Sequence, residues 1–400
     1  MRILLIDVNC KKGSTGKIVY ALYSELRANG HDAAICYGRG PLVSEPDIFR
    51  FSSKLEVYIH ALLTRVTGLT GCFSMFATRR LLRIIEEFKP DIVHIHELHA
   101  YFVNIAPLIR YLKKKKQKTV WTFHCEFMFT GKCGNACDCE RYQTGCGKCP
   151  YLRRYVSSWF FDFTARMLKQ KEKLFEGFEN LTIAPVSDWL LERAKKSPFL
   201  ADKHFMVVKN GIDLSVFYPQ DSQNLCEKLG LADEKIIIHV APYFHDAQKG
   251  GQHVLKLARM LEGENIKIII VGAGKPIDDC PQNVIAVSYI ADQSELAEYY
   301  SLGDVFVITS EMENLPTVCL ESLCCGTPVV GFDAGGTSET APSPYGIFVK
   351  HGDVEELNRV VLKVFSNEIL LASPEQCAEF GHAHYDKNLM MSNYFNIYSD

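Results

Sequence analysis

The sequence lacks an excess of basic residues, a long uncharged apolar run and an internal repeat. Its 44 Lys and Arg are slightly outnumbered by 47 Asp and Glu, and the resulting net charge of −3 argues against a nucleic-acid-binding protein. No uncharged apolar run approaches the roughly 18 residues of a membrane span. The apolar residues that begin the chain are soon interrupted by Asp7, Lys11 and Lys12, so we interpret them as a buried strand and not as an export signal. We therefore expect a cytoplasmic protein with no nucleic-acid partner.

Short β-type runs alternate with amphipathic helical stretches along all 400 residues, 47% of which are hydrophobic. The β-type runs are continuously apolar, which is typical of parallel strands that helices cover on both faces. The alternation therefore predicts an α/β protein with parallel sheets. The expected strands are 3–7, 33–37, 91–96, 119–124, 182–186, 204–208, 235–240, 266–271, 283–287, 304–309 and 328–332.

The number of strands also predicts more than one domain. Eleven strands are many for one sheet, and the alternation breaks at the turn-rich segment 209–219. We therefore predict two Rossmann-like domains, 1–214 and 215–375, and a C-terminal helix at 376–400 that packs back on the first domain. Because ligands of parallel α/β sheets bind beyond the carboxyl ends of the strands, we expect the two domains to face each other across a cleft that holds the site.

The most informative segment follows the expected strand 304–309. Pro316 suits the first turn of a helix, because its missing N–H would be unpaired there. Glu313 then lies in the loop before this helix, and Glu321 lies within the helix. Free N–H groups at residues 314–318 would bind an anion, and a carboxylate accepts two hydrogen bonds from a vicinal diol. The segment offers what a sugar nucleotide needs, although an ordinary helix start with acidic residues has the same pattern.

This segment resembles the retaining glycosyltransferases of family 4, which have the GT-B fold. The hallmark of that family is two glutamates separated by seven residues, here Glu313 and Glu321, and the motifs Gly326-Thr-Pro, Gly335-Gly336 and Glu339 also resemble it. The resemblance implies that Glu321 binds the ribose hydroxyls of a nucleotide-sugar donor. It also implies that Glu313 and the amides of Asn314 and Leu315 bind the donor sugar.

A second loop resembles the part of the family that holds the donor diphosphate. Lys249 matches a lysine of that site, but the arginine expected five residues earlier is Phe244 in this chain. One lysine is a point charge and cannot fork two phosphate oxygens as arginine does, so His245 or an arginine elsewhere is left to compensate. Gly272 and Ile290 resemble further donor-binding landmarks, although a strand end and a helix start would explain them equally well.

The first domain offers a glycine-containing loop and several histidines. Gly13 and Gly16 follow the first strand and let a ligand approach the backbone closely, although a tight turn is the alternative. His124 matches a family histidine that supports the reacting centre, and His99 is a weaker candidate. By resemblance, His124, Lys249 and Glu313 form the catalytic set. The same resemblance implies retention at the anomeric carbon and no metal cofactor for catalysis.

A cysteine cluster follows His124. Six of the 15 cysteines lie between positions 125 and 149. Cys146 and Cys149 have the spacing of a zinc knuckle, and Cys133 with Cys137 or Cys139 could complete a structural zinc site. Free thiols and disulfides are the alternatives. Similar polysaccharide glycosyltransferases include a subset with such an insert, here 125–150.

The sequence as a whole predicts a retaining hexosyltransferase of polysaccharide biosynthesis, with a saccharide or lipid-linked saccharide as acceptor. The five lysines of 113–118 and the aromatic stretch 159–163 are candidates for docking at the inner face of the cell membrane. A solvated helix end is the alternative for the lysines. Two other functions stay open, namely a nucleotide-sugar epimerase on the same fold and a non-catalytic sugar-nucleotide-binding partner subunit.

Overall fold

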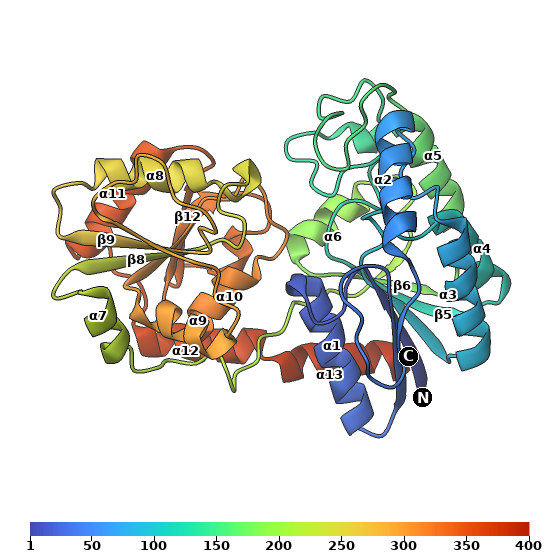
Figure 1. The fold of residues 1–400 in the computed structure, drawn as a ribbon, viewed down its shortest axis with the longest axis horizontal. Helices are drawn as coiled ribbons and strands as arrows, with labels where there is room; N and C mark the ends of the chain where they lie inside the picture. Colours follow the sequence, from blue (N-terminus) through green and yellow to red (C-terminus); the bar gives the residue numbers. More distant parts are fainter. Residues whose placement is uncertain (400) are drawn as a thin grey trace. The chain divides into compact units, whose positions relative to one another are not determined.

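The computed structural model describes residues 1–399 and divides into two compact units. Unit 1 comprises Met1–Lys209 together with the chain from Met391 onward, and unit 2 comprises Asn210–Met390. Each unit has one parallel β-sheet with helices packed on it (Figure 1). The prediction of two Rossmann-like α/β domains is confirmed.

Unit 1 is built on a seven-stranded sheet with the order β3-β2-β1-β4-β5-β6-β7. Its central strands are completely buried, because helices cover both faces of a parallel sheet; residues Ile3 to Ile6 of β1, for example, expose no surface. Its elements are β1 (Arg2–Asp7), α1 (Gly13–Ala28), β2 (Asp32–Tyr37), β3 (Ile48–Arg50), α2 (Lys54–Thr67), α3 (Met75–Phe88), β4 (Ile92–Ile95), α4 (Ile105–Lys114), β5 (Lys118–Phe123), the 3-10 turn η1 (Arg141–Gln143), α5 (Thr164–Phe175), β6 (Leu181–Pro185), α6 (Asp188–Lys195), β7 (His204–Phe205) and, from Met391 onward, α13 (Lys387–Ser399).

Unit 2 has a six-stranded sheet with the order β10-β9-β8-β11-β12-β13. Aliphatic side chains of β8, β9 and β11 pack with those of α8 and α11 to form its core. Its elements are α7 (Gln223–Leu229), β8 (Lys235–Val240), η2 (Ala247–Lys249), α8 (Gly251–Met260), β9 (Ile266–Val271), β10 (Val284–Val287), α9 (Gln293–Leu302), β11 (Val305–Ile308), α10 (Thr317–Cys324), β12 (Val329–Asp333), η3 (Ser338–Thr340), β13 (Gly346–Lys350), α11 (Val354–Phe365) and α12 (Pro374–Tyr385).

The end of the chain differs from the single helix expected at 376–400. It forms two helices, and only α13 reaches unit 1. There the hydroxyl of Tyr398 lies 2.6 Å from Nδ1 of the buried His94, and the hydroxyl of Tyr394 lies 2.8 Å from Oγ1 of Thr122. The preceding helix α12 belongs to unit 2, where Nε2 of His382 lies 3.1 Å from the carbonyl oxygen of Cys324. The break comes at Asp386, whose φ of −58° and ψ of 131° are not helical.

Each sheet has one point at which the order of its strands reverses. In unit 1 the chain adds β2 and β3 on one side of β1 and later adds β4 on the other. In unit 2 it adds β9 and β10 on one side of β8 and later adds β11 on the other. Loops that leave the carboxyl ends of such strand pairs diverge and leave room for a ligand. These two switch points are therefore where functional side chains are expected.

Candidate functional site

An ion pair marks the switch point of unit 2. Nζ of Lys249, after β8, lies 2.8 Å from Oε1 of Glu313, after β11. The two side chains are 36% and 20% exposed, so both can still reach a ligand. Burial lowers the pKa of Lys249, but the adjacent Glu313 carboxylate outweighs this effect and the net pKa is raised. Lys249 is therefore a fixed ammonium at neutral pH, suited to binding a phosphate oxygen.

The backbone around this pair is held by close contacts at two glycines. Gly250 has φ +72°, and a Cβ atom there would lie 1.8 Å from the carbonyl oxygen of Thr309. Gly335 has φ +75°, and a Cβ atom there would lie 2.2 Å from the carbonyl oxygen of Glu313. The same carbonyl accepts a 2.8 Å hydrogen bond from the N–H of Gly336. The Gly335-Gly336 motif thus fixes the main chain of Glu313.

Gly335→Ala should destabilise unit 2 more than a Gly→Ala change at another position with positive φ where the new Cβ atom meets no neighbour. A left-handed alanine alone costs about 1–2 kcal/mol, which is all that Gly263→Ala should lose, because Gly263 has φ +92° and nothing within 4 Å of its missing Cβ. Gly335→Ala adds the clash with Glu313, so its loss should reach about 3 kcal/mol or more. Urea denaturation measures both, and equal losses would contradict this account of the loop.

The second glutamate of the signature is oriented by a buried tyrosine. Oε2 of Glu321, in α10, accepts a 2.8 Å hydrogen bond from the hydroxyl of Tyr300 in α9. Burial, followed by the Glu321 charge, raises the pKa of Tyr300 well above 10, so the phenol remains a donor. The backbone carbonyl of Tyr300 in turn accepts a 2.6 Å bond from Oγ1 of Thr327. The Gly326-Thr-Pro motif therefore supports Glu321 through α9.

The start of α10 provides backbone donors between the two glutamates. Pro316 occupies the N-cap position, one residue before the first turn in which the sequence placed it. The first N–H groups of a helix have no acceptor within the helix, and the helix dipole favours an anion there. Asn314 and Leu315 directly precede this turn, and Nδ2 of Asn210 donates to the carbonyl of Leu315 over 3.4 Å. Glutamate carboxylates and an anion-binding helix start thus lie in one short segment.

Phe244, which stands where the family resemblance predicted arginine, belongs to the core. It is only 3% exposed and is part of the apolar cluster of unit 2. A Cβ atom on Gly251 would lie 2.9 Å from its ring, so the two residues pack in direct contact. The adjacent His245 is exposed to solvent. Lys249 is consequently the cation that this loop places beside Glu313.

The other two predicted donor-binding positions in unit 2 follow β9 and β10. Gly272 has φ +96°, and a Cβ atom there would lie 2.4 Å from the carbonyl oxygen of Ala241, so its glycine is needed for strand packing whatever it binds. Ile290 is half-buried in the loop after β10, next to the exposed Tyr289. Both lie at the carboxyl edge of the sheet, as does Lys249.

The switch point of unit 1 is organised by Asp7, which the sequence analysis did not select. Its buried carboxylate accepts hydrogen bonds of 3.1 Å from the N–H groups of Asn9 and Glu97, which joins the ends of β1 and β4. Burial raises its pKa to about 7. Gly13 begins α1 with φ +71° and open space around it, whereas a Cβ atom on Gly16 would lie 3.3 Å from Asn9. The loop is thus compact at Gly16 and accessible at Gly13.

His124 stacks on a second histidine, His96. Its Nε2 is 3.0 Å from Nδ1 of His96, and the two rings stack with centroids 5.3 Å apart. Burial lowers the pKa of His124 to about 4, so it is a neutral imidazole. A neutral ring can support a reacting centre by hydrogen bonding but brings no charge to it.

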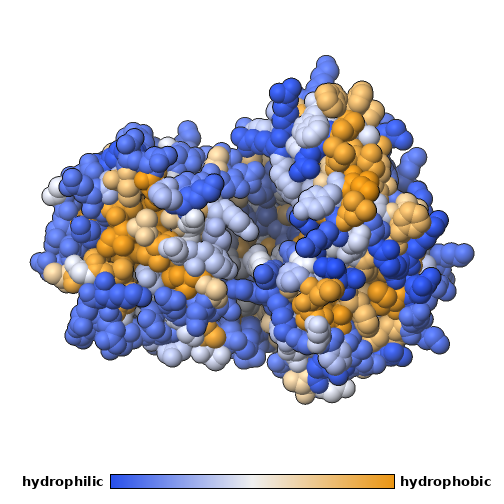
Figure 2. Space-filling view, in the orientation of Figure 1, coloured by the Kyte–Doolittle hydropathy of each residue, from blue (hydrophilic) through white to orange (hydrophobic). Residues whose placement is uncertain are grey.

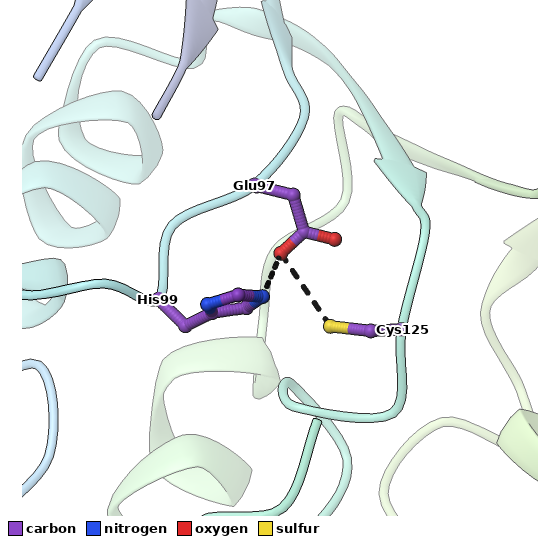
Figure 3. Close-up of side chains that lie close together, drawn as sticks. All are labelled: Glu97, His99 and Cys125. Atoms are coloured by element: carbon purple, nitrogen blue, oxygen red, sulfur yellow. Dashed lines mark hydrogen bonds and ion pairs between the residues drawn. The ribbon is translucent and has the colours of Figure 1, made fainter. Parts of the chain in front are cut away.

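The charge near His124 comes instead from Glu97 and His99. Oε2 of Glu97 lies 2.6 Å from Nε2 of His99 and accepts a 3.4 Å hydrogen bond from the thiol of Cys125 (Figure 3). Burial opposes both charges, but their mutual attraction prevails: the pKa of His99 is raised well above 6.5 and that of Glu97 is lowered. Sequence reasoning missed Glu97, whose only signal was its position just after an expected strand.

Replacement of His99 by glutamine should weaken unit 1 with a characteristic pH profile. The raised pKa of His99 stabilises the fold fully below pH 6.5, and this stabilisation is lost as the pH rises through the folded-state pKa of His99. The lowered pKa of Glu97 stabilises the fold above pH 4.5, and this stabilisation is lost as the pH falls through the folded-state pKa of Glu97. His99→Gln should therefore lower the free energy of unfolding most between pH 4.5 and pH 6.5, by about 2–4 kcal/mol. Denaturation across pH 4–9 tests this, and adding Glu97→Gln should recover much of the loss. A pH-independent loss would contradict the ion pair.

The cysteine cluster lies in the loop between β5 and α5. All 15 cysteines are free thiols. Cys133, Cys139, Cys146 and Cys149 line one small cavity, which they share with Lys132 and Thr164. Cys137 does not line it; its sulfur lies 3.7 Å from Nη1 of Arg154.

In a comparison with known proteins, each of the two units matches a protein-family model. The model described as "Glycosyltransferase Family 4" matches residues 15–216, and that described as "Glycosyl transferases group 1" matches residues 221–384. WcaC of Escherichia coli (strain K12), assigned as a colanic acid biosynthesis glycosyl transferase, is 23% identical over the whole of both chains. The N,N'-diacetylbacillosaminyl-diphospho-undecaprenol alpha-1,3-N-acetylgalactosaminyltransferase of Campylobacter jejuni is 25% identical over 50% of this chain and 55% of its own. The structure of Anabaena Alr3699/HepE with UDP-glucose has a TM-score of 0.66 at 15% identity and covers all of both chains, which shows a shared fold.

Proposed function

Because the chain belongs to glycosyltransferase family 4, we propose that it transfers a hexose from a nucleotide-diphosphate sugar to a saccharide or lipid-linked saccharide, with retention of the anomeric configuration. The group 1 match covers the unit that contains Lys249, Glu313 and Glu321. The observation that carries the proposal is the Lys249–Glu313 pair, held at the switch point of unit 2 and followed directly by the start of α10. A cation, a helix start and two carboxylates are what a diphosphate joined to two sugars requires.

In this proposal each group of unit 2 binds a different part of the donor. Glu321, oriented by Tyr300, accepts hydrogen bonds from the ribose hydroxyls. Glu313 accepts them from the hexose, and the amides around Asn314 and Leu315 bind alongside it. Lys249 stabilises the negative charge that grows on the phosphate as the sugar departs. Because that phosphate oxygen can take the proton of the attacking hydroxyl, the protein's main contributions are positioning and electrostatics.

The acceptor is proposed from the relatives and from the surface of unit 1. One relative is assigned to colanic acid biosynthesis, and the name of another specifies a diphospho-undecaprenol substrate. A growing polysaccharide or its lipid-linked precursor fits both. An enzyme with a lipid-linked acceptor has to work at a bilayer, so the surface of unit 1 should show how it docks there.

Unit 1 carries an apolar patch, made by α2, the start of α3 and the segment 159–161, which fits docking on a bilayer. Figure 2 shows an apolar area over α2. The N–H of Trp159 donates to the carbonyl of Arg65, so the segment lies beside the end of α2. Residues 53–83 contain five basic side chains and one acidic one, which favours binding to the anionic surface of a bilayer. The exposed apolar side chains of the patch are Leu55, Tyr58, Ile59, Leu62, Leu63, Met75, Phe76, Trp159, Phe160 and Phe161.

The patch supports a peripheral mode of binding. No helix within residues 1–399 combines the length and apolar character needed to cross a membrane. The lysine run, the other candidate, is partly used by the fold, because Nζ of Lys113 donates to the carbonyl of Glu176 and Nζ of Lys118 donates to that of Tyr398. We therefore base the docking proposal on the patch.

The double variant Leu62→Glu with Phe160→Glu should lose binding to vesicles of phosphatidylglycerol and phosphatidylethanolamine. Each change replaces an exposed apolar side chain by a charge that the bilayer interface disfavours, and together they should weaken binding by about 10-fold or more. Cosedimentation measures it. The matched control is Leu370→Glu, in unit 2, which changes a leucine that is also exposed, 76% against 52% for Leu62. Retained binding in the double variant, or equal loss in the control, would contradict the docking surface.

A donor screen followed by product analysis tests the activity. A nucleotide sugar that binds should raise the melting temperature by mass action. NMR of the reaction with that donor and a saccharide acceptor should show a new glycoside with the donor's anomeric configuration. Free epimer without transfer would indicate the epimerase alternative, and binding without any turnover would indicate a non-catalytic subunit.

A further inference from the structure

The segment that follows His124 has almost no regular structure to hold it. Between β5 and α5, residues 124–163, the described chain contains a single 3-10 turn, η1. The segment is nevertheless compact: the N–H of Gly147 donates to Oγ1 of Thr164 over 3.0 Å, and the N–H of Cys149 donates to Asp162 over 2.6 Å. Its part 131–149 contributes few buried apolar side chains besides Ala136 and Tyr142, and loops with little apolar core usually depend on a covalent or metal crosslink. With all 15 cysteines free, a disulfide does not supply it here.

Four cysteine side chains line the interior of this segment. Cys133, Cys139, Cys146 and Cys149 line one cavity of about 20 Å³, large enough for one ion or water molecule.

The backbone between the last two thiols forms a tight left-handed turn. Gly145, Cys146, Gly147 and Lys148 all have positive φ, from 47° to 125°. Two of these four residues have side chains and would avoid this region in a free loop. The turn places the Cys146 and Cys149 side chains on the same cavity.

Two buried lysines beside the thiols have no carboxylate partner in contact among residues 1–399. Nζ of Lys132 donates to the carbonyls of Arg154 and Val156, both over 3.0 Å. Nζ of Lys171 donates to the carbonyls of Phe127 and Thr130. The cysteines Cys133 and Cys146 lie near Lys171. Buried cations are costly unless an anion compensates them, and four thiolates around a divalent ion carry a net charge of −2.

We propose that Cys133, Cys139, Cys146 and Cys149 bind one Zn²⁺ ion as a closed structural site, with Lys132 and Lys171 balancing its charge. Thiolates are the ligands that zinc prefers in such sites, at about 2.3 Å and in tetrahedral geometry. Cys139 is the fourth ligand, and Cys137 is not, because only Cys139 lines the cavity. The ion fixes the segment that directly follows His124.

Another group of ligating side chains has more closely spaced donor atoms. Those of Glu97, His99 and Cys125 all lie within 4.8 Å of one another (Figure 3). Their polar atoms are already matched, however, by the Glu97–His99 ion pair and the Cys125 hydrogen bond. This group also contains a single thiol, whereas the cavity described above is lined by four. The test must nevertheless separate the two locations.

Metal content of the full-length protein, purified without chelator and measured by elemental mass spectrometry, tests the site. The expected result is one zinc per chain, falling below about 0.1 in Cys146→Ser with Cys149→Ser. Cys137→Ser, in the same loop, and Cys125→Ser should each retain one zinc. Zinc lost with Cys125→Ser but kept in the double variant would move the site to Glu97 and His99 and overturn the proposal.

A thiol count of the wild-type protein keeps the proposal falsifiable if the double variant does not fold. Denatured with EDTA and without reductant, the chain should show 15 reactive thiols and release one zinc. Fifteen thiols without zinc would mean free cysteines, and 13 or fewer would mean disulfides. Either outcome would overturn the metal site without bearing on the proposed transferase activity.

Discussion

Lys249→Met is expected to lower kcat for sugar transfer by about 10²- to 10³-fold, the usual effect of removing one preorganised group that stabilises charge in a transition state. Lys249 faces Glu313 across 2.8 Å, and buried Phe244 leaves it as the cation of its loop. Methionine keeps the length and apolar stem of the side chain, so the change removes little besides the charge. Donor binding should weaken less than kcat falls, because the charge on the leaving phosphate grows as the sugar departs.

The matched control is Lys256→Met. Lys256 is exposed on α8 and pairs with Glu355, 2.6 Å away, in an ion pair of the same chemical type. Exposed pairs contribute little to stability, so this variant should keep wild-type kinetics and melting temperature. Steady-state kinetics with the donor found by the screen would decide. A kcat within about threefold of wild type in Lys249→Met would remove this residue from the mechanism.

Glu321→Gln is expected to weaken the affinity for the donor nucleotide by about 10- to 100-fold, the value of one or two hydrogen bonds to a charged acceptor. Glutamine keeps the shape but has only one acceptor oxygen, so it cannot accept hydrogen bonds from both hydroxyls of a ribose. Tyr300→Phe, which removes the hydrogen bond that orients Glu321, should have a smaller effect in the same direction. Calorimetric titration with the nucleoside diphosphate measures both dissociation constants.

The control for this pair is Glu295→Gln, an exposed glutamate on α9. It lies on the same helix as Tyr300 and should leave the dissociation constant unchanged. If Glu321→Gln bound the nucleotide as tightly as wild type, the ribose assignment would be wrong. If only Tyr300→Phe lost affinity, the tyrosine and not the glutamate would contact the ligand.

The interior strands could be predicted from the sequence, but some edge strands could not. Buried parallel strands need mostly apolar runs, and β1, β4, β5, β8 and β9 have them, with only single polar residues or a few threonines and histidines between the apolar ones. The missed strands β3 and β13 both lie at sheet edges, where partial exposure weakens the pattern. The expected strand 204–208 shrinks to the two residues of β7 at the other edge of its sheet.

The candidate site could be predicted only residue by residue. Lys249 and Glu313 were selected separately, but 64 positions separate them, and only the pairing of β8 with β11 brings them together. Tyr300 and Asp7 carry no motif, because their roles depend on partners that other elements supply. Phe244 was recognised as a departure from the family, yet its use in the core appears only with the packing of Gly251.

The surface was the least predictable part. The lysine run looked like a docking surface in the sequence, but Lys113 and Lys118 bond to the backbone of neighbouring segments. The apolar residues of α2 do not predict a docking surface in the sequence, because apolar residues on a helix usually indicate a buried face. Exposure depends on which elements pack nearby, and no local pattern records that.

Hydrogen exchange with and without a saturating nucleotide sugar tests the central claim most directly. The account predicts that the donor slows exchange of the backbone amides in peptides covering 309–321 and 247–251, while peptides of α11 keep their rate. Protection confined to other parts of the chain, with 309–321 unchanged at saturation, would contradict the donor site between Lys249, Glu313 and Glu321.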